Sequence, residues 1–414
     1  MHGGDHDSRQ AAGRHAPRPA PAPMVAANSA LKRPQAGGAS AQGGRMQDID
    51  FTRTLIIKPS SLGDVVQALP VLTALREAHP QARVAWLAAA PLADLLLGHP
   101  RLDEVILFDR RRFGHVGRSL TVTADFMAFI QDVRQRRFTA VLDLQGLFRS
   151  GFLAAATGAP ARVGFASARE LATVFYTLAV PLPHDEMHAV DRYLALARHI
   201  GLAEPRARDH LPVAGESRAA VRARLAGEGI APQEPLVVVA AHARWATKQW
   251  PPERFAEVLL RLHGETGARG VLVGGGAAAP VGRQVAERAA CARPIDLSDR
   301  TTLKEMVALV AEARAVVTND SGPMHVAAAV GTPVAAIFGP THPGRTGPYG
   351  PGHRVLTGQA ACRPCFRREC PYGGAEGALE CLLTVKADEV ARHLLEIWRE
   401  SPMLNSRHGD GERK

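Results

Sequence analysis

Short apolar segments alternate with longer stretches of helical periodicity along most of the chain. They occur at 54–58, 83–89, 105–108 and 140–144, and the alternation restarts after residue 215 with segments at 236–241, 270–273, 315–318 and 334–338. Such an alternation is typical of parallel strands connected by helices. Because it occurs twice, we predict an α/β protein with two facing Rossmann-like domains, each built on a parallel sheet.

The segments outside this alternation indicate where the domains begin and end. Residues 201–218 are polar, contain two prolines and lack periodicity, which is typical of a linker. Residues 1–50 have no apolar periodicity and no hydrophobic segment of a secretion signal, which predicts a disordered tail. We therefore expect an N-terminal tail at 1–50, a first domain at 51–215, a second domain at 216–385, a closing helix at 386–400 and a C-terminal tail at 401–414.

In open parallel sheets, ligands bind beyond the carboxyl ends of the strands. The loop after the first predicted strand reads "KPSSLGDVV". There Ser60 or Ser61 can cap the next helix, Gly63 lets the backbone approach a ligand, and Asp64 lies in the first helical turn. Local sequence alone favours a helix-capping role for Asp64 over a chemical one. We also expect Pro70 to kink or divide this helix.

A second loop of this kind follows the strand predicted at 315–318. The residues 319–322 form a tight turn, and the free amides of the next helix, with the Ser321 hydroxyl, make a site for phosphate or pyrophosphate. His325 in the first turn can reach the same anion, although a satisfied, partly buried histidine is an equally supported interpretation. Thr341 follows the next predicted strand and would lie beside this turn.

A third such loop, at 240–255, contains Lys248. A lysine there is suited to neutralising phosphate oxygens, with a solvated surface lysine as the alternative. The glycines at 274–276 do not keep the G-x-G-x-x-G spacing, which disfavours NAD binding.

Charge narrows the possible partners. The chain has 50 Lys and Arg against 40 Asp and Glu, a net charge of +10, which favours an anionic partner. Aromatic residues make up only 5%, and no basic stretch is interleaved with them, so nucleic acid is disfavoured. No apolar run reaches the length needed to span a bilayer.

Four stretches together resemble one family, glycosyltransferase family 9, the ADP-heptose:lipopolysaccharide heptosyltransferases. They read "IIKPSSLGDVVQALPVLTALREAHP", "VLDLQGLFRSG", "HARWATKQWPPERF" and "TNDSGPMHVAAAVGTPVAAIFGPTHPGRTGPYG", and the resemblance runs from residue 53 to 398. It implies a GT-B fold, with the acceptor in the N-terminal domain and the nucleotide sugar in the C-terminal one. It also implies an inverting transfer that needs no metal and no cofactor.

The resemblance assigns roles to individual residues. Asp64 corresponds to the base that accepts the acceptor proton, and Lys248 to the charge that stabilises the leaving diphosphate. Donor-binding residues would be Asp320, Ser321, Gly322, His325 and Thr341. Acceptor-binding residues would be Lys58, Ser61, Gly63, Arg110, Arg111 and Arg169. A solvated charge run is a competing interpretation of the arginines at 110–112, and Arg244 and Trp245 depart from the family pattern, which leaves the donor sugar open.

The implied enzyme uses ADP-heptose and a lipid-anchored anionic core acceptor. It is expected in the cytoplasm, in peripheral contact with the inner membrane, where its positive charge would hold it against anionic lipid. A family 9 transferase with another donor or acceptor, and an inactive nucleotide-sugar-binding protein, remain alternatives.

Four cysteines lie close together in sequence, at Cys362, Cys365, Cys370 and Cys381. The first pair has the spacing of zinc ligands, but the second pair does not repeat it. Reduced thiols packed under a loop are favoured over a zinc or iron–sulfur site.

Overall fold

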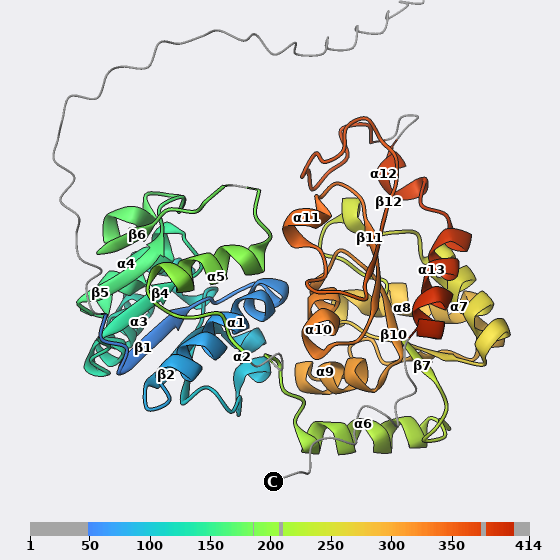
Figure 1. The fold of residues 1–414 in the computed structure, drawn as a ribbon, viewed down its shortest axis with the longest axis horizontal. Coiled ribbons are helices and arrows are strands. Elements are labelled where there is room, and N and C mark those ends of the chain that lie inside the picture. Colours follow the sequence, from blue (N-terminus) through green and yellow to red (C-terminus); the bar gives the residue numbers. More distant parts are fainter. Residues whose placement is uncertain (1–48, 185, 207–209, 374–377, 401–414) are drawn as a thin grey trace, which may run out of the picture. The chain divides into compact units, whose positions relative to one another are not determined.

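The computed structural model describes residues 49–184, 186–206, 210–373 and 378–400 (Figure 1). The predicted tails at 1–50 and 401–414 lie outside the described residues, apart from Ile49 and Asp50. Within the described ranges, no helix combines the length and the apolar character that crossing a bilayer requires.

The first sheet has six parallel strands in the order β3-β2-β1-β4-β5-β6. Its strands are β1 (Arg53–Ile57), β2 (Arg83–Ala89), β3 (Glu104–Phe108), β4 (Ala140–Asp143), β5 (Ala161–Phe165) and β6 (Leu178–Val180). Its helices are α1 (Leu62–Ala78), α2 (Ala90–Leu96), α3 (Leu120–Gln135), α4 (Phe148–Ala156) and α5 (Ala189–His199), with short 3-10 turns η1 (Arg112–His115) and η2 (Ala172–Phe175).

The second sheet repeats this plan in the order β12-β11-β10-β7-β8-β9. Its strands are β7 (Leu236–Ala240), β8 (Arg269–Leu272), β9 (Ile295–Asp296), β10 (Ala315–Asn319), β11 (Val334–Phe338) and β12 (Arg354–Thr357). Its helices are α6 (Gly215–Gly227), α7 (Pro252–Thr266), α8 (Ala279–Arg288), α9 (Leu303–Glu312), α10 (Gly322–Val330), α11 (Pro343–Thr346), α12 (Glu380–Leu383) and α13 (Ala387–Glu400), with 3-10 turns η3 (Ala246–Lys248), η4 (Gly276–Ala278) and η5 (Ala290–Ala292).

Both sheets confirm the predicted α/β class. In each, the strand order reverses at the first strand of the half, between β1 and β4 and between β7 and β10. Loops that follow these paired strands diverge to opposite faces of the sheet and leave a crevice in which α/β proteins bind ligands. The loops after β1, β4, β7 and β10 are therefore where side chains can meet a substrate.

Every strand predicted from the apolar segments is present, within one residue at each end. Four strands, β5, β6, β9 and β12, were not predicted. β6 and β9 have only three and two residues, and β5 and β12 include arginines, so none of them stands out as an apolar run. Their positions depend on pairing with neighbours already in the sheet.

Two local predictions are contradicted in part, namely the end of the linker and the division of the first helix at Pro70. The linker predicted at 201–218 overlaps α6, which begins at Gly215. Glu216 lies in the first turn of this helix, where a carboxylate interacts favourably with the helix dipole. Pro70 does not divide α1, which continues from Leu62 to Ala78. Its neighbours from Val65 to Leu75 are buried, and this packing offsets the one backbone hydrogen bond that proline removes.

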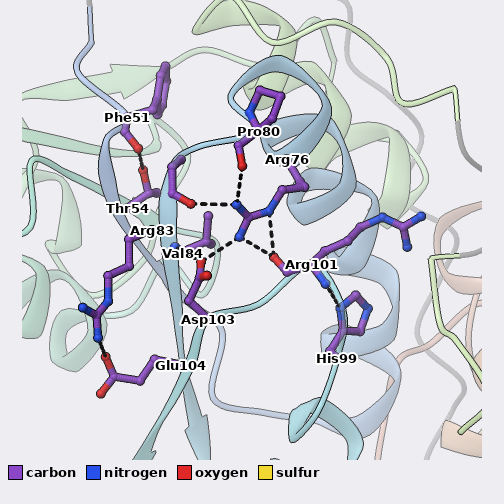
Figure 2. A network of polar contacts seen from close by, with 11 residues as sticks. Phe51, Thr54, Arg76, Pro80, Arg83, Val84, His99, Arg101, Asp103 and Glu104 are labelled. Carbon is purple, nitrogen blue, oxygen red and sulfur yellow. Dashed lines mark hydrogen bonds and ion pairs between the residues drawn. The ribbon is translucent and has the colours of Figure 1, made fainter.

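Arg76, in the last turn of α1, holds the connections on either side of β2 (Figure 2). Its guanidinium donates to the carbonyls of Pro80 (3.0 Å), Ala82 (2.7 Å) and Arg101 (3.0 Å), and to Asp103 Oδ2 (2.7 Å). Asp103 Oδ2 also accepts from the Val84 amide (2.7 Å). One side chain thus satisfies three loop carbonyls with charge-assisted hydrogen bonds.

We expect Arg76→Ala to lower the free energy of unfolding by about 2–4 kcal/mol, because it leaves three carbonyls and a carboxylate without their charged donor. Urea denaturation followed by circular dichroism measures the loss. Arg83→Ala is the matched control. Its side chain is 62% exposed, and its ion pair with Glu104 is long at 3.9 Å, so we expect a change of about 0.5 kcal/mol or less (Figure 2). Equal losses in the two variants would contradict this account.

Candidate functional site

Asp64 lies in the first turn of α1, shortly beyond the carboxyl end of β1. Its Oδ2 atom accepts hydrogen bonds from the Ser61 amide (2.9 Å) and the Ser61 hydroxyl (2.6 Å). Its Oδ1 atom lies 3.9 Å from Lys58 Nζ, and the side chain is 43% exposed. The helix-capping interpretation therefore accounts for one oxygen of Asp64 and leaves the other directed at the Lys58 side of the loop.

The surroundings of Asp64 keep it ionised at neutral pH. Partial burial opposes the charge, but the Lys58 ammonium and the two Ser61 hydrogen bonds outweigh it, and the pKa of Asp64 lies below its usual value. An ionised, partly exposed carboxylate, with one oxygen that accepts no hydrogen bond from a described residue, can accept a proton.

Lys58 is buried, with 4% of its surface exposed. Its ammonium donates to the Leu144 carbonyl (3.1 Å) after β4 and lies 5.3 Å from the centre of the Tyr193 ring. Burial disfavours its charge, but nearby Tyr193, Asp64 and Asp143 more than compensate, and the pKa of Lys58 is raised. Its role as an acceptor-binding residue stays a prediction; its contacts point toward Asp64.

The loops after β7 and β10 meet at an ion pair between Lys248 Nζ and Asp320 Oδ2 (2.6 Å). Both side chains are largely shielded from water, with 16% and 5% exposed. Thr341, after β11, donates its hydroxyl to the same Asp320 oxygen (2.5 Å). Asp320 thus holds Lys248 in place through the ion pair, and Thr341 holds Asp320 through its hydroxyl.

The first turn of α10 contains the remaining predicted donor residues. The hydroxyl of Ser321, its N-cap, lies 3.1 Å from the Thr318 hydroxyl. His325 is buried, and burial lowers its pKa to about 4 although Asp320 and Asp64 favour its charged form. His325 is therefore neutral at pH 7 and has one ring N–H to donate.

The amino ends of α1 and α10 pack directly against each other. A Cβ atom on Gly63 would lie 2.3 Å from His325 Cδ2, and a Cβ on Gly322 would lie 2.7 Å from Leu62 Cδ2. Only glycine permits this approach. Asp64, from the first half of the chain, is therefore brought beside the histidine and the Asp320–Lys248 pair from the second half.

Several residues that shape this site were not among the site residues predicted from the sequence. Asn319 joins two loops, because its Oδ1 accepts from the Trp250 amide (3.1 Å) and its Nδ2 donates to the Ala241 carbonyl (2.6 Å). Asp143, at the end of β4, is buried, which raises its pKa, and accepts from the Tyr176 hydroxyl (2.7 Å). His188 lies 3.1 Å from the Gly347 carbonyl through Nε2. Only the strand-end position of Asn319 and Asp143 could have indicated them.

The predicted acceptor arginines lie farther along the same edge of the first sheet. Arg110 and Arg111 are exposed after β3, and Arg169 is exposed after β5. None of the three forms an ion pair with a described residue. These arginines lie at the same sheet edge as Asp64, which follows β1, but they do not contact Asp64.

The four cysteines at 362–381 are free thiols, with Cys381 buried and the other three partly buried. Burial, followed by the nearby Cys362, Cys365 and Cys370, raises the pKa of Cys381 to about 11. In the part of the chain that the structure describes, no three or more His, Cys, Asp or Glu side chains are grouped as a metal site.

Comparisons with known proteins agree on one family. The profile described as "Glycosyltransferase family 9 (heptosyltransferase)" matches residues 126–376. Lipopolysaccharide heptosyltransferase 1 of Pseudomonas aeruginosa is 32% identical over 359 residues, which cover 86% of this chain and 94% of that protein. The Salmonella typhimurium protein of the same name is 31% identical over 317 residues, 75% of this chain and 94% of that one.

Solved structures share the architecture. Escherichia coli heptosyltransferase WaaC with ADP superposes with a TM-score of 0.65 at 26% identity, covering 83% of this chain and 99% of that one. A glycosyl transferase family 9 structure from Veillonella parvula has a TM-score of 0.72 at 24% identity, covering 86% and 99%, and shows the fold alone. With its two doubly wound sheets in the GT-B fold, and with these matches over most of its length, the chain belongs to glycosyltransferase family 9.

Proposed function

We propose that this protein transfers heptose from ADP-heptose to the inner core of lipopolysaccharide, with inversion at the anomeric carbon and without a metal ion. The observation that carries the proposal is the placement of Asp64 beside His325 and the Lys248–Asp320 pair at the touching ends of α1 and α10. Both curated relatives are named lipopolysaccharide heptosyltransferases, and WaaC was also solved with ADP-2-deoxy-2-fluoro heptose.

Asp64 is the proposed base. As the acceptor oxygen forms a bond to C1 of the heptose, its proton passes to Asp64 Oδ1, while the bond between C1 and the ADP oxygen breaks with its electron pair leaving on ADP. The Ser61 hydrogen bonds hold the other carboxylate oxygen and fix the direction of Oδ1. In such an in-line displacement the attacking oxygen and the departing ADP lie on opposite sides of C1, so a single step inverts the anomeric configuration.

The leaving diphosphate gains negative charge, which cationic and amide donors can stabilise. Lys248 directs one N–H at Asp320 and has two more to offer. The first amides of α10, the Ser321 hydroxyl and the neutral His325 ring lie around the same turn. This set offers the diphosphate one ammonium group and several N–H and O–H donors, in the role that a divalent cation has in metal-dependent transferases.

The acceptor is proposed to be a lipid-anchored, anionic core saccharide. Arg110, Arg111 and Arg169 present guanidinium groups suited to phosphate and carboxylate at the edge of the first sheet. An enzyme with this donor and this acceptor works in the cytoplasm, in peripheral contact with the inner membrane.

Another nucleotide sugar is the second candidate donor, and Trp245 is the observation that favours it. Its ring lies 4.6 Å from Lys248 Nζ and 5.3 Å from the Arg368 guanidinium carbon, at a position where the chain departs from the family pattern. A bulky ring beside the diphosphate-binding lysine restricts the size of the transferred sugar.

Incubation of the purified chain with truncated lipopolysaccharide acceptors and ADP-heptose, UDP-glucose or ADP-glucose tests the proposal. We expect mass spectrometry to detect a heptose adduct with ADP-heptose only, and NMR to show the inverted linkage. EDTA should leave the rate unchanged. A glucose adduct would identify the second candidate, and a rate lost in EDTA and restored by Mg²⁺ would refute the metal-free mechanism.

The pH dependence should report the contact between Lys58 and Asp64. Lys58 lowers the pKa of Asp64, so Lys58→Met should raise that pKa. The base is active when deprotonated, and the acid limb of the kcat/KM profile should therefore move to higher pH. Lys386→Met, which removes an exposed lysine after α12, is the control and should leave the profile unchanged. A profile in Lys58→Met that coincides with the wild-type one would contradict this assignment.

A further inference from the structure

One face of the first half exposes apolar side chains to an unusual degree. Helix α3 has sixteen residues, but Val133 alone among them is buried. The outward positions Leu120, Ala124, Met127 and Ala128 are all exposed, and they follow the spacing of a single helical stripe. Leu120 is 92% exposed and Met127 60%. A stripe of this kind is typical of a surface that another body covers.

The apolar face continues over the neighbouring elements. Phe148 and Phe152 on α4 are 49% and 38% exposed, and Leu171 and Val174 at η2 are 73% and 69% exposed. Ring contacts connect the elements: Phe152 packs on Phe126 of α3 (6.3 Å), and both α4 rings pack on Phe175 of η2 (5.2 and 6.2 Å). We call Leu120, Met127, Phe148, Phe152, Leu171 and Val174 the apolar face.

The backbone at Leu171 adds a second observation. Glu170 and Leu171 both adopt left-handed conformations, with φ of 55° and 58°. This conformation is unfavourable for a residue other than glycine. Here the unfavourable conformation places Leu171 in solvent. Neither the packing of this side chain nor its backbone conformation stabilises the fold. Costly local choices of this kind concentrate at functional positions.

Unpaired arginines surround the apolar face. Arg118 precedes Leu120 by two residues, Arg149 follows Phe148 directly, and Arg169 precedes Leu171 by two. Arg110 and Arg111 precede η1, whose Phe113 packs on Phe126 (5.2 Å). All five are exposed, and none has an ion-pair partner among the described residues. Apolar side chains flanked by arginines match a bilayer with an anionic surface, because the side chains enter the acyl boundary while the guanidinium groups bind headgroup phosphates.

We propose that the apolar face and its arginines dock this protein on an anionic lipid bilayer. This proposal rests on the proposed function, and it assigns to this surface the membrane contact which that function requires. The elements η1, α4 and η2 follow β3, β4 and β5, so they lie at the carboxyl edge of the first sheet, where Asp64 follows β1. A bilayer bound there presents a lipid-anchored acceptor at the edge that holds the base.

Flotation of the full chain with vesicles tests the proposal. We expect binding to phosphatidylglycerol–phosphatidylethanolamine vesicles, little binding to phosphatidylcholine vesicles, and weaker binding at high salt. The triple variant Leu120→Ser, Met127→Ser, Leu171→Asn should bind the anionic vesicles at least roughly tenfold more weakly, given the apolar area it removes. Leu260→Ser, which changes an exposed leucine on α7, should bind like the wild type. All variants keep residues 1–48, so any binding by that segment is common to them.

Leu171→Asn alone separates docking from folding. Asparagine tolerates the left-handed conformation better than leucine, so this variant should keep or raise the unfolding temperature while it weakens vesicle binding. Leu379, with a φ of 56°, provides the matched control in the second half, and Leu379→Asn should not change vesicle binding.

Transfer assays distinguish failure of docking from failure of the proposed function. The triple variant should use a deacylated, soluble core acceptor as well as the wild type does, and should show a raised KM for the acceptor in vesicles. If the wild type transferred heptose to the soluble acceptor but did not bind vesicles, the proposed docking surface would be refuted and the proposed activity would stand. A third outcome would assign the apolar face to a second copy of the chain. In that case the wild type would not bind vesicles but would self-associate in sedimentation equilibrium, and the triple variant would not self-associate.

Discussion

Replacing Asp64 with asparagine is expected to lower kcat for heptose transfer about a thousandfold, within the range that loss of a general base produces. Asparagine has nearly the same shape, and its side-chain oxygen can still accept the Ser61 amide and hydroxyl bonds that cap α1. What it lacks is a basic oxygen to receive the acceptor proton. Initial rates of ADP release measure the loss, and the Kd for ADP-heptose, from calorimetry, should stay within about twofold of the wild-type value because the proposed donor contacts lie on α10 and η3.

Two further variants make this result specific to Asp64. Asp132→Asn removes an exposed carboxylate from α3 and should leave the rate within about twofold of the wild type. Ser61→Ala keeps the Asp64 carboxylate but removes one of the bonds that orient it and lower its pKa, so it should reduce the rate only severalfold and move the acid limb to higher pH. If Asp64→Asn kept more than a tenth of the wild-type rate, the carboxylate would be a helix cap and nothing more.

The fold was largely predictable because its central strands consist of apolar residues that are buried on both faces. Every residue of β7, β10 and β11 is buried, and these strands are also the clearest apolar runs in the sequence. Of the four strands that were not predicted, β6 and β9 are very short and β5 and β12 include arginines, and their existence depends on neighbours in the sheet. The domain boundaries at 51–215 and 216–385 remain a prediction.

The site was predictable as a set of loops but not as a set of contacts. The rule that ligands bind beyond the carboxyl ends of strands directed attention to Asp64, Lys248 and Ser321. No sequence pattern indicates that Lys248 pairs with Asp320, because these residues lie 72 positions apart and meet only when β7 and β10 pair. The burial of Lys58 under Tyr193 likewise depends on how α5 packs against α1.

Replacing Lys248 with methionine is expected to lower kcat about a hundredfold to a thousandfold, because the leaving diphosphate loses its nearest cation. The same change leaves Asp320, only 5% exposed, as an unpaired carboxylate, since Thr341 offers only a neutral donor. Breaking a buried ion pair from one side costs about 3–5 kcal/mol, so lost activity in this variant could reflect a weakened fold.

The double variant Lys248→Met, Asp320→Asn resolves this ambiguity. Asparagine removes the unpaired charge and can still accept the Thr341 hydroxyl, so the double variant should recover most of the stability lost in Lys248→Met. Its rate should remain as low as that of the single variant, because neither change restores a cation beside the diphosphate. Urea denaturation and ADP release measured on the same preparations compare the two quantities. Recovery of the rate together with stability would mean that Lys248 acts on the fold, and the leaving group would then need another source of positive charge.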